Sequence, residues 1–300
     1  MVPAGCPGPG ACMIRFSAGD VRLTVLDAGS LWLDGGAMFG VVPKPLWSRV
    51  SQPDDRNRIH LKMNVLLIED GDQRVLVDTG AGTRWNDKER DIYGLDVKDA
   101  DALVAPAGLT ADRIDLVINT HLHFDHAGGN VRPDGDGGLT AAFPNARYVV
   151  QKGEVETARW KNERIRASYR ADDFEPLARD DRLWLVEGEA SVGPNIVLRP
   201  APGHTPHMQV PMVVTTERTI AFLADLVPTT SPLPYPYIMG YDLEPLTTLA
   251  TKKRFLPEAV REGWHVIFEH DPETPLATLS EEGGRVKARS AEFVADTRGV

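Results

Sequence analysis

One short segment constrains this chain more than any other. His121-Leu122-His123-Phe124-Asp125-His126 brings three of the eight histidines and a carboxylate into six consecutive positions, directly after an apolar run at residues 114–118 that predicts a buried strand. Residues i and i+2 of an extended backbone share a face, so His121 and His123 can bind one ion together. Beyond the turn, Asp125 and His126 can face a second ion. An exposed polar loop with chance histidines is the alternative, which the scarcity of histidine elsewhere disfavours.

Three further side chains of ligand type each follow an apolar strand. They are His204, in a Gly-His-Thr-Pro loop, Asp225 after residues 219–223, and His270 after residues 264–268. A nitrogen and oxygen donor set without thiolate suits two divalent metal ions, Zn²⁺ first, with Mn²⁺, Co²⁺ or Fe tolerated. Three-histidine sites with room for a water are catalytic in type. The candidate ligands form one group of His121, His123 and His204 and another of Asp125, His126 and His270, with Asp225 bridging both.

Other polar residues are harder to assign. Asp78 ends the predicted strand at residues 74–78, where an aspartate can hold the second ring nitrogen of a ligand histidine or can cap a turn. Both interpretations stay open from the residues alone. His265 lies an odd number of residues from His270, so on a strand it faces the other way. His60 is also expected to have no ligand role. His207 is expected to be an unliganded surface residue, with a supporting contact near His204 as the less favoured alternative.

Composition sets the class of protein. A chain of 300 residues can bury a full core, and we expect one domain over residues 13–300 after a disordered, Pro- and Gly-rich leader at residues 1–12. Cys6 and Cys12 both lie in that leader, where a disulfide or a metal pair is the less favoured alternative. The net charge of −10, without a basic stripe, argues against nucleic acid. No apolar run suits a membrane helix and no secretory signal is recognisable, so we expect a cytoplasmic protein without a membrane partner.

Most of the remaining chain predicts short strands, with a surface helix expected at residues 154–167 and the longest helix at residues 243–261. Residues 33–47 are apolar but broken by Gly and Pro. They can form a loop folded onto its own core, or a protruding arm that makes a subunit contact or a wall of the substrate pocket. Both can hold together.

The histidine motif, followed by His204, Asp225 and His270 in that order, resembles the metallo-β-lactamase superfamily, and Asp78 in Val-Asp-Thr-Gly matches the strand-end aspartate usual there. The resemblance runs from about residue 21 to residue 270. It implies an α/β fold, an αββα sandwich of two mixed sheets with outer helices, and a dinuclear site at one edge of the sandwich.

Within that superfamily, residues 34–47, 120–126 and 224–229 resemble the longer quorum-quenching N-acyl-homoserine lactonases. The resemblance implies a homodimer with the arm near its interface. Pro206 runs directly into His207, where related sequences often continue Gly-His, and Pro228 replaces a substrate-binding tyrosine found in some lactonases. The residues then expected to line a pocket for an apolar acyl chain are Met38, Phe39, Trp47 and Leu233, with Tyr235 or Tyr237 as the substitute tyrosine.

The expected reaction is opening of a lactone ring by a hydroxide that bridges the two metals. Asp225 and Asp125 are the expected catalytic carboxylates, one bridging the ions and the other carrying a proton to the leaving oxygen. The same ligands would serve a thioester hydrolase of the glyoxalase II type or a phosphotriesterase. A β-lactamase, an iron redox protein and a binding protein with structural metals are less favoured.

Overall fold

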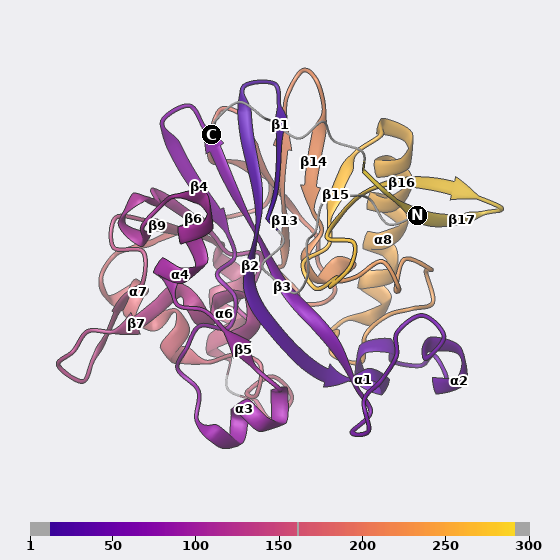
Figure 1. The fold of residues 1–300 in the computed structure, drawn as a ribbon, viewed down its shortest axis with the longest axis horizontal. Helices are drawn as coiled ribbons and strands as arrows, with labels where there is room; N and C mark the ends of the chain where they lie inside the picture. The colour runs from indigo at the N-terminus through magenta and orange to yellow at the C-terminus, as the bar shows by residue number, and fades with distance from the viewer. Residues whose placement is uncertain (1–12, 161, 292–300) are drawn as a thin grey trace.

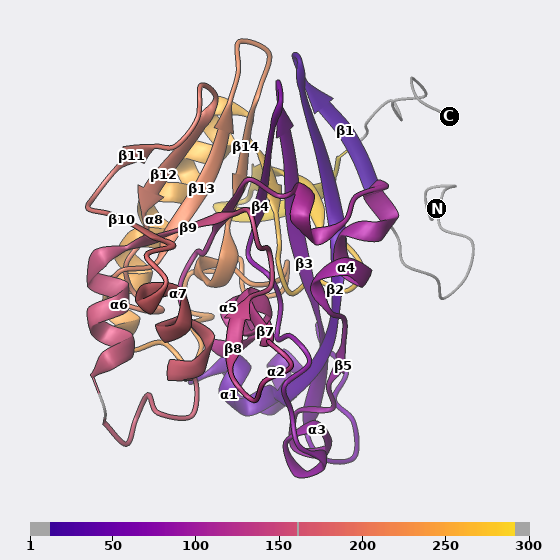
Figure 2. The ribbon, with the colours of Figure 1, turned by 90° about the vertical axis from the view of Figure 1, so that its left-hand side faces the viewer.

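Two mixed β-sheets packed face to face organise the molecule. The computed structural model describes residues 13–160 and 162–291, so the leader with Cys6 and Cys12 lies outside the described residues. Figure 1 shows the two sheets with helices on their outer sides, and Figure 2 shows the same layers after a quarter turn. The expected αββα sandwich is thereby confirmed. Among the described residues, no helix has the length and apolar character needed to cross a membrane.

The first sheet is built from the first part of the chain. Its antiparallel strands are followed by three parallel pairings, β4 with β6, β6 with β9 and β9 with β10. Its order is β1 (Ile14–Ala18), β2 (Val21–Asp34), β3 (Arg58–Asp70), β4 (Gln73–Val77), β6 (Leu116–Ile118), β9 (Arg147–Gln151) and β10 (Leu183–Val186), and β5 (Asp96–Val97) pairs with β2. A separate two-stranded ribbon joins β7 (Val131–Pro133) to β8 (Leu139–Ala141).

The second sheet takes its strands in chain order from the rest of the sequence. One pairing, β14 with β15, is parallel, because α8 (Pro245–Glu262) makes the crossover between these strands. The order is β11 (Ala190–Ser191), β12 (Ile196–Pro200), β13 (Gln209–Val214), β14 (Thr219–Phe222), β15 (His265–Ile267), β16 (Leu276–Glu282) and β17 (Arg285–Ser290).

The first sheet is buried on both faces, which explains why its central strands read as continuous apolar runs. On β4, Val75 and Val77 point into the core between the sheets, whereas Leu76 points to a second core under the outer helices. Val117 of β6 shares that outer core. Each such side chain removed from water contributes about 1.5–3 kcal/mol, so the sheet is held firmly on both sides.

Short helices cover the outer faces, with α4 packed on β2 and α8 on β16. The expected helix at residues 243–261 is confirmed by α8, where Pro245 occupies the first turn and Gly263 ends the helix in a left-handed conformation. The other α-helices are α1 (Gly35–Phe39), α2 (Lys44–Trp47), α3 (Asp87–Tyr93), α4 (Ala100–Val104), α5 (Phe124–Ala127), α6 (Lys152–Arg159) and α7 (Glu175–Arg179). Single 3₁₀ turns are η1 (Ala105–Ala107), η2 (Ala111–Arg113), η3 (Gly128–Asn130), η4 (Ala171–Asp173) and η5 (Ala224–Leu226).

The helix expected at residues 154–167 is shorter than predicted. It ends at Arg159, and the side chain of Asn162 accepts hydrogen bonds from the backbone of Arg164 and Ile165, which starts a separate turn. Ile165 still packs with Val155 in one small core, although the two residues lie on separate elements. The asparagine cap competes with the helix, because it satisfies two backbone donors locally.

The arm predicted at residues 33–47 consists of the end of β2 followed by α1 and α2. Trp47 stacks on Phe39 with ring centroids 5.3 Å apart, and it covers Gly35, where a Cβ atom would approach the indole to 2.4 Å. The arm therefore folds onto its own core. It still exposes Val41 and Leu46 to solvent.

Candidate metal centre

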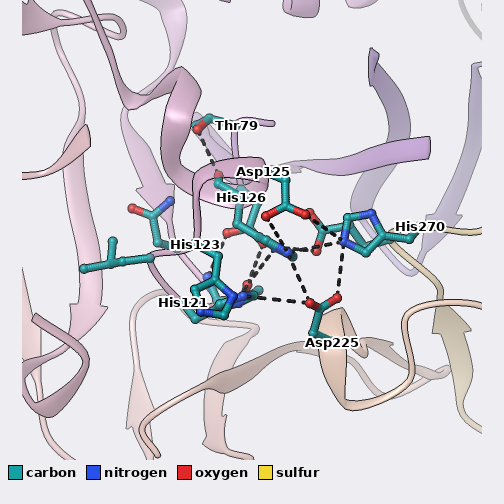
Figure 3. Close-up of polar contacts among 12 residues, drawn as sticks. Thr79, His121, His123, Asp125, His126, Asp225 and His270 are labelled. Carbon is teal, nitrogen blue, oxygen red and sulfur yellow. Dashed lines mark hydrogen bonds and ion pairs between the residues drawn. The ribbon is translucent and has the colours of Figure 1, made fainter. Parts of the chain in front are cut away.

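The seven candidate ligands converge at one edge of the sandwich, where strands of both sheets end. His121 and His123 follow β6, and Asp125 and His126 lie in the single turn of α5. The other ligands come from the second sheet: His204 follows β12, Asp225 lies in η5 after β14, and His270 follows β15. All seven are buried, with at most 7% of any of them exposed. Figure 3 shows six of these side chains pointing toward a common centre.

The first group contains His121, His123, His204 and Asp225. His204 Nε2 lies 3.0 Å from His123 Nδ1 and 3.0 Å from Asp225 Oδ2. His121 Nε2 lies 4.0 Å from the same Asp225 oxygen. Four donor atoms thus surround one small space.

The second group contains Asp125, His126 and His270. His126 Nε2 and His270 Nε2 are 3.3 Å apart, and His270 Nε2 lies 3.7 Å from Asp125 Oδ2. Asp225 reaches this group too, with Oδ1 at 3.2 Å from His270 Nε2 and Oδ2 at 3.6 Å from His126 Nε2. The carboxylate of Asp225 therefore lies between the two groups, as a bridging ligand would.

These spacings fit metal ions better than they fit a hydrogen-bonded cluster. Two nitrogens bound tetrahedrally to one ion at ~2.0–2.1 Å lie about 3.3 Å apart, close to the separations seen in both groups. His121 Nε2 is buried and has no hydrogen-bond partner among the described residues. The ion pairs that Asp125 and Asp225 form within the described chain are all with histidines. A buried polar nitrogen and two buried carboxylates without Lys or Arg are satisfied if cations occupy the space.

The surrounding residues fix which ring nitrogen faces the centre. His204 Nδ1 lies 2.9 Å from Asp242, and His270 Nδ1 lies 2.7 Å from the carbonyl oxygen of Lys62. His121 Nδ1 lies 3.0 Å from the hydroxyl of Thr120. Each contact leaves Nε2 free for an ion. His123 is reversed and presents Nδ1 to the centre.

His126 has two carboxylates at its outer nitrogen. Asp78 Oδ2 lies 3.1 Å from His126 Nδ1, and Glu269 Oε2 lies 2.9 Å from the same atom. Asp78 also accepts hydrogen bonds from the backbone and the hydroxyl of Thr120, and it has the left-handed φ of 57°. Of the two interpretations of Asp78, the structure places it against a histidine of the second group, not at the start of a helix.

Burial and neighbouring charges set the protonation of the cluster. Burial, reinforced by the other histidines, lowers the pKa of His121 and His123 well below the ordinary value, so both are neutral. Burial raises the pKa of Asp225, but His204 and His270 outweigh it and hold that pKa well below its usual range. Neutral imidazole and ionised carboxylate are the forms that bind metal, so these three groups are in their ligand forms. Burial lowers the pKa of His204 and His270 as well, but Asp225 outweighs it and raises these pKa values to about 10 and about 9, so these two imidazoles would give up a proton when a cation binds.

A pocket opens onto the centre, and it differs from the expected one. Met38 lines it, as expected, but Phe39 and Trp47 pack behind it in the core. Leu233, Tyr235 and Tyr237 line a separate cavity against the hairpin of β16 and β17. The lining residues that the sequence analysis did not identify are Leu33, Leu61, Tyr93, Phe124, Ala167, Ser168, Met239 and Tyr241. Phe124 stands inside the histidine motif, which is the one local signal that pointed to it.

The remaining histidines lie outside the two groups. His60 packs on Trp32 with ring centroids 5.1 Å apart, and His207 lies against Gly153 at the start of α6. His265 is a half-buried residue of β15.

Comparison with known proteins agrees with this geometry. Residues 61–279 match the family model of the metallo-beta-lactamase superfamily. An N-acyl homoserine lactonase of Bacillus cereus is 27% identical over 242 residues, which is 72% of this chain and 84% of the relative.

Solved structures give the same result. A probable metal-dependent hydrolase from Staphylococcus aureus superposes with a TM-score of 0.84 at 29% identity, covering 93% of this chain and 99% of that one. An N-acyl homoserine lactone hydrolase with N-hexanoyl-L-homoserine bound at its catalytic metal centre gives a TM-score of 0.64 at 25% identity, covering 84% and 93%. The family match spans most of the chain, and the protein is therefore a hydrolase of the metallo-beta-lactamase superfamily.

Proposed function

We propose that this hydrolase opens the lactone ring of N-acyl homoserine lactones with a pair of divalent metal ions. The observation that carries the proposal is the pocket beside the centre, whose lining joins Asp125, Asp225 and His270 to an apolar wall. No Lys or Arg is among its described lining residues. A neutral substrate with an ester to cleave and an apolar chain fits such a pocket. The relatives named N-acyl homoserine lactonase support the same substrate class.

The two groups would hold the ions, most simply Zn²⁺, with Mn²⁺, Co²⁺ or Fe as the other candidates for this donor set. When bound, divalent cations polarise an ester carbonyl and make a water nucleophilic at neutral pH. Asp225 lies between the groups and holds them at a fixed separation. Asp125 lines the pocket and could accept the proton that the attacking water releases and pass it to the ring oxygen as the ester bond breaks. A lactone needs no second pocket for its leaving group, because that group stays attached.

The pocket walls assign roles to the rest of the substrate. Phe124 packs against two aromatic rings. Trp85 meets it edge to face with ring centroids 5.1 Å apart, and Tyr93 lies at 5.0 Å with its ring tilted by 42°. With Met38 and Met239, Phe124 and Tyr93 offer an apolar surface to the acyl chain. Tyr241 also lines the pocket, and burial, with Asp34 and Asp125 nearby, raises its pKa. Its hydroxyl therefore stays protonated and can donate a hydrogen bond to a substrate carbonyl. Tyr235 and Tyr237, which were expected in this role, line the other cavity instead.

Substrate hydrolysis tests the proposal directly. Metal-replete protein should hydrolyse N-acyl homoserine lactones faster than thioesters, phosphotriesters or a β-lactam, measured as kcat/KM across the panel. A glutathione thioester should be a poor substrate because the described lining of the pocket includes no Lys or Arg to bind its carboxylates. Chelation should remove the activity, and Zn²⁺ should restore it.

Substitution of one ligand should have the same effect. His123→Ala should abolish hydrolysis while leaving much of the fold intact, because the imidazole faces the centre and only its ring face packs on Tyr169. His60→Ala is the matched control and should keep its activity. A His123→Ala protein with near-full activity would falsify the ligand assignment.

We also propose that the protein is a homodimer whose interface includes the arm. Val41 is 89% exposed and Leu46 is 47% exposed, although both lie on a segment otherwise folded onto the core. Exposed apolar side chains close together on one surface segment are typical of a contact with another chain. Met38 of the same segment lines the pocket, so the contact would also steady one pocket wall.

A further inference from the structure

We infer that Glu154 is a positioning residue that holds the two loops of the first metal group in register. The inference rests on the metal-binding part of the proposed function and is independent of the substrate. Glu154 lies on α6, a helix with mostly polar residues, yet none of its surface is exposed. It is not a member of either metal group.

The carboxylate of Glu154 accepts three hydrogen bonds. Oε1 accepts from the backbone N–H of Leu122 at 3.1 Å and from the hydroxyl of Tyr169 at 2.7 Å. Oε2 accepts from the hydroxyl of Thr205 at 2.7 Å. Burial raises the pKa of Glu154, and these three donors oppose that effect. No Lys or Arg forms a described ion pair with Glu154, so these hydrogen bonds, together with the nearby His204, compensate for its burial.

Each of the three donors is attached to the first metal group. Leu122 is the residue between His121 and His123, and Thr205 directly follows His204. Tyr169 packs its ring on the imidazole of His123, with centroids 4.6 Å apart and planes inclined at 66°. Its backbone also forms an isolated β-bridge with His123.

This arrangement addresses a specific geometric problem. The first group draws its histidines from two loops that are about eighty residues apart in the sequence, and His123 Nδ1 must lie 3.0 Å from His204 Nε2. One oxygen of Glu154 holds the loop of His123, and the other oxygen holds the loop of His204. A rigid carboxylate therefore fixes the separation of the loops, which is how residues behind a metal site set its affinity.

The second metal group does not share this support. Asp125 and His126 lie on α5, and the outer nitrogens of His126 and His270 contact Asp78, Glu269 and the carbonyl of Lys62 instead. Loss of Glu154 should therefore act on one ion and spare the other. A purely structural role would not produce that selectivity.

Zinc affinity tests the inference without any substrate. In a His270→Ala background, where only the first group keeps all its ligands, Glu154→Gln should weaken Zn²⁺ binding about ten- to hundredfold in competition with a chromophoric chelator. Glutamine keeps the size of the side chain but replaces one acceptor oxygen with an amide donor. In a His123→Ala background, the same substitution should leave Zn²⁺ binding to the second group unchanged.

Two further variants keep the test sharp. Thr205→Val removes one donor at constant shape and should weaken the same ion, and its effect combined with Glu154→Gln should be smaller than the product of the two. Asp173→Asn is the matched control, because Asp173 is a fully buried acid paired with Arg84 outside both groups. It should lower the unfolding midpoint without changing Zn²⁺ affinity.

Two results would overturn the inference. One is Glu154→Gln protein that loses stability as Asp173→Asn does but binds Zn²⁺ in both backgrounds as tightly as the parent proteins. The other is an equal loss of affinity at both groups. Failure of the proposed function would look different. A protein that binds two ions but hydrolyses no lactone would refute the proposed substrate and leave the role of Glu154 intact.

Discussion

The imidazole of His126 illustrates how single residues prepare this centre. Its outer nitrogen meets both Asp78 and Glu269, although one N–H can satisfy only one strong acceptor at a time. Asp78 is fixed by two hydrogen bonds from Thr120. Burial raises the pKa of Glu269 to about 8, with Asp78 adding to the effect and His126 opposing it. The pair therefore combines one firmly held carboxylate with one that takes up a proton readily.

Asp78 should accordingly control the second ion. Asp78→Asn keeps the shape and tolerates the left-handed φ, but it removes the negative charge that orients His126. In a His123→Ala background we expect Zn²⁺ affinity to fall about ten- to hundredfold, measured by chelator competition. The first ion, measured in a His270→Ala background, should lose much less affinity, because Asp78 reaches that group only through Thr120, whose hydroxyl contacts His121. Equal affinities for the Asn variant and its parent in both backgrounds would show that Asp78 only supports the fold.

For single residues, the sequence predicts the metal ligands better than it predicts the residues that orient those ligands. The positions of His121, His123 and His126 follow from local spacing and a strand end, both of which are readable along the chain. Asp242, Glu154 and Glu269 act through contacts with residues distant in sequence, and each stands among other charged or polar residues. Nothing local distinguishes a buried glutamate on a polar helix from an exposed one. Tyr241 was missed for the same reason, since the path of its loop depends on packing.

Among the elements, α8 does more than cross between two strands. Lys252, with 1% of its surface exposed, points its ammonium group at three backbone carbonyls of the loop at residues 232–237, those of Pro232, Pro234 and Tyr237. That loop leads on to Met239 and Tyr241 in the pocket. The helix thus holds one wall of the pocket through a single buried cation.

The burial of Lys252 should make stability depend on pH. Burial lowers its pKa to about 8, with Asp242 opposing, whereas the unfolded chain keeps a pKa of about 10.4. Between these values the unfolded state binds the extra proton, so the free energy of unfolding should rise with pH, by up to about 3 kcal/mol. Lys252→Met should lack this rise. Urea unfolding at pH 7 and pH 10 measures both slopes, and identical slopes in the two proteins would contradict the assignment.

The elements were predictable where a regular pattern ran unbroken. The central strands of the sandwich and α8 follow their apolar periodicity closely, whereas the strands β1, β16 and β17 are not among the predicted elements. The helix at residues 154–167 was predicted too long, because its polar faces gave no signal for the competing cap at Asn162. The sequence of the arm does not decide between a folded loop and a protruding segment, since Gly and Pro mask the short helices that Trp47 and Phe39 hold together.

For the molecule as a whole, the proposed dimer is the next question. Val41→Asp combined with Leu46→Asp should convert the dimer to monomers, because charge would be buried in an apolar contact. Sedimentation velocity measures the mass, and the unfolding midpoint of the separated protomer should change little, since both side chains are exposed in it. Val214→Asp, at a half-exposed apolar residue of β13, is the control and should stay dimeric. A parent protein that sediments as a monomer at micromolar concentration would rule out the dimer.

The overall architecture can be predicted from the sequence more completely than the shape of the pocket can. The order of the ligand residues along the strands ties the chain to one sandwich, and the match over residues 61–279 agrees with it. The shape of the pocket depends on side chains from strands, helices and loops far apart in the sequence, whose mutual packing no local pattern encodes.

The two sheets divide the polypeptide cleanly: every strand of the first lies before residue 187, and every strand of the second lies after residue 189. The chain passes between them once, through the exposed residues Glu187, Gly188 and Glu189. A break at this passage would leave each half with an unbroken sheet but only a share of the proposed donors, four on one piece and three on the other. Hydrolysis by such a cleaved protein would then report that its two halves had reassociated.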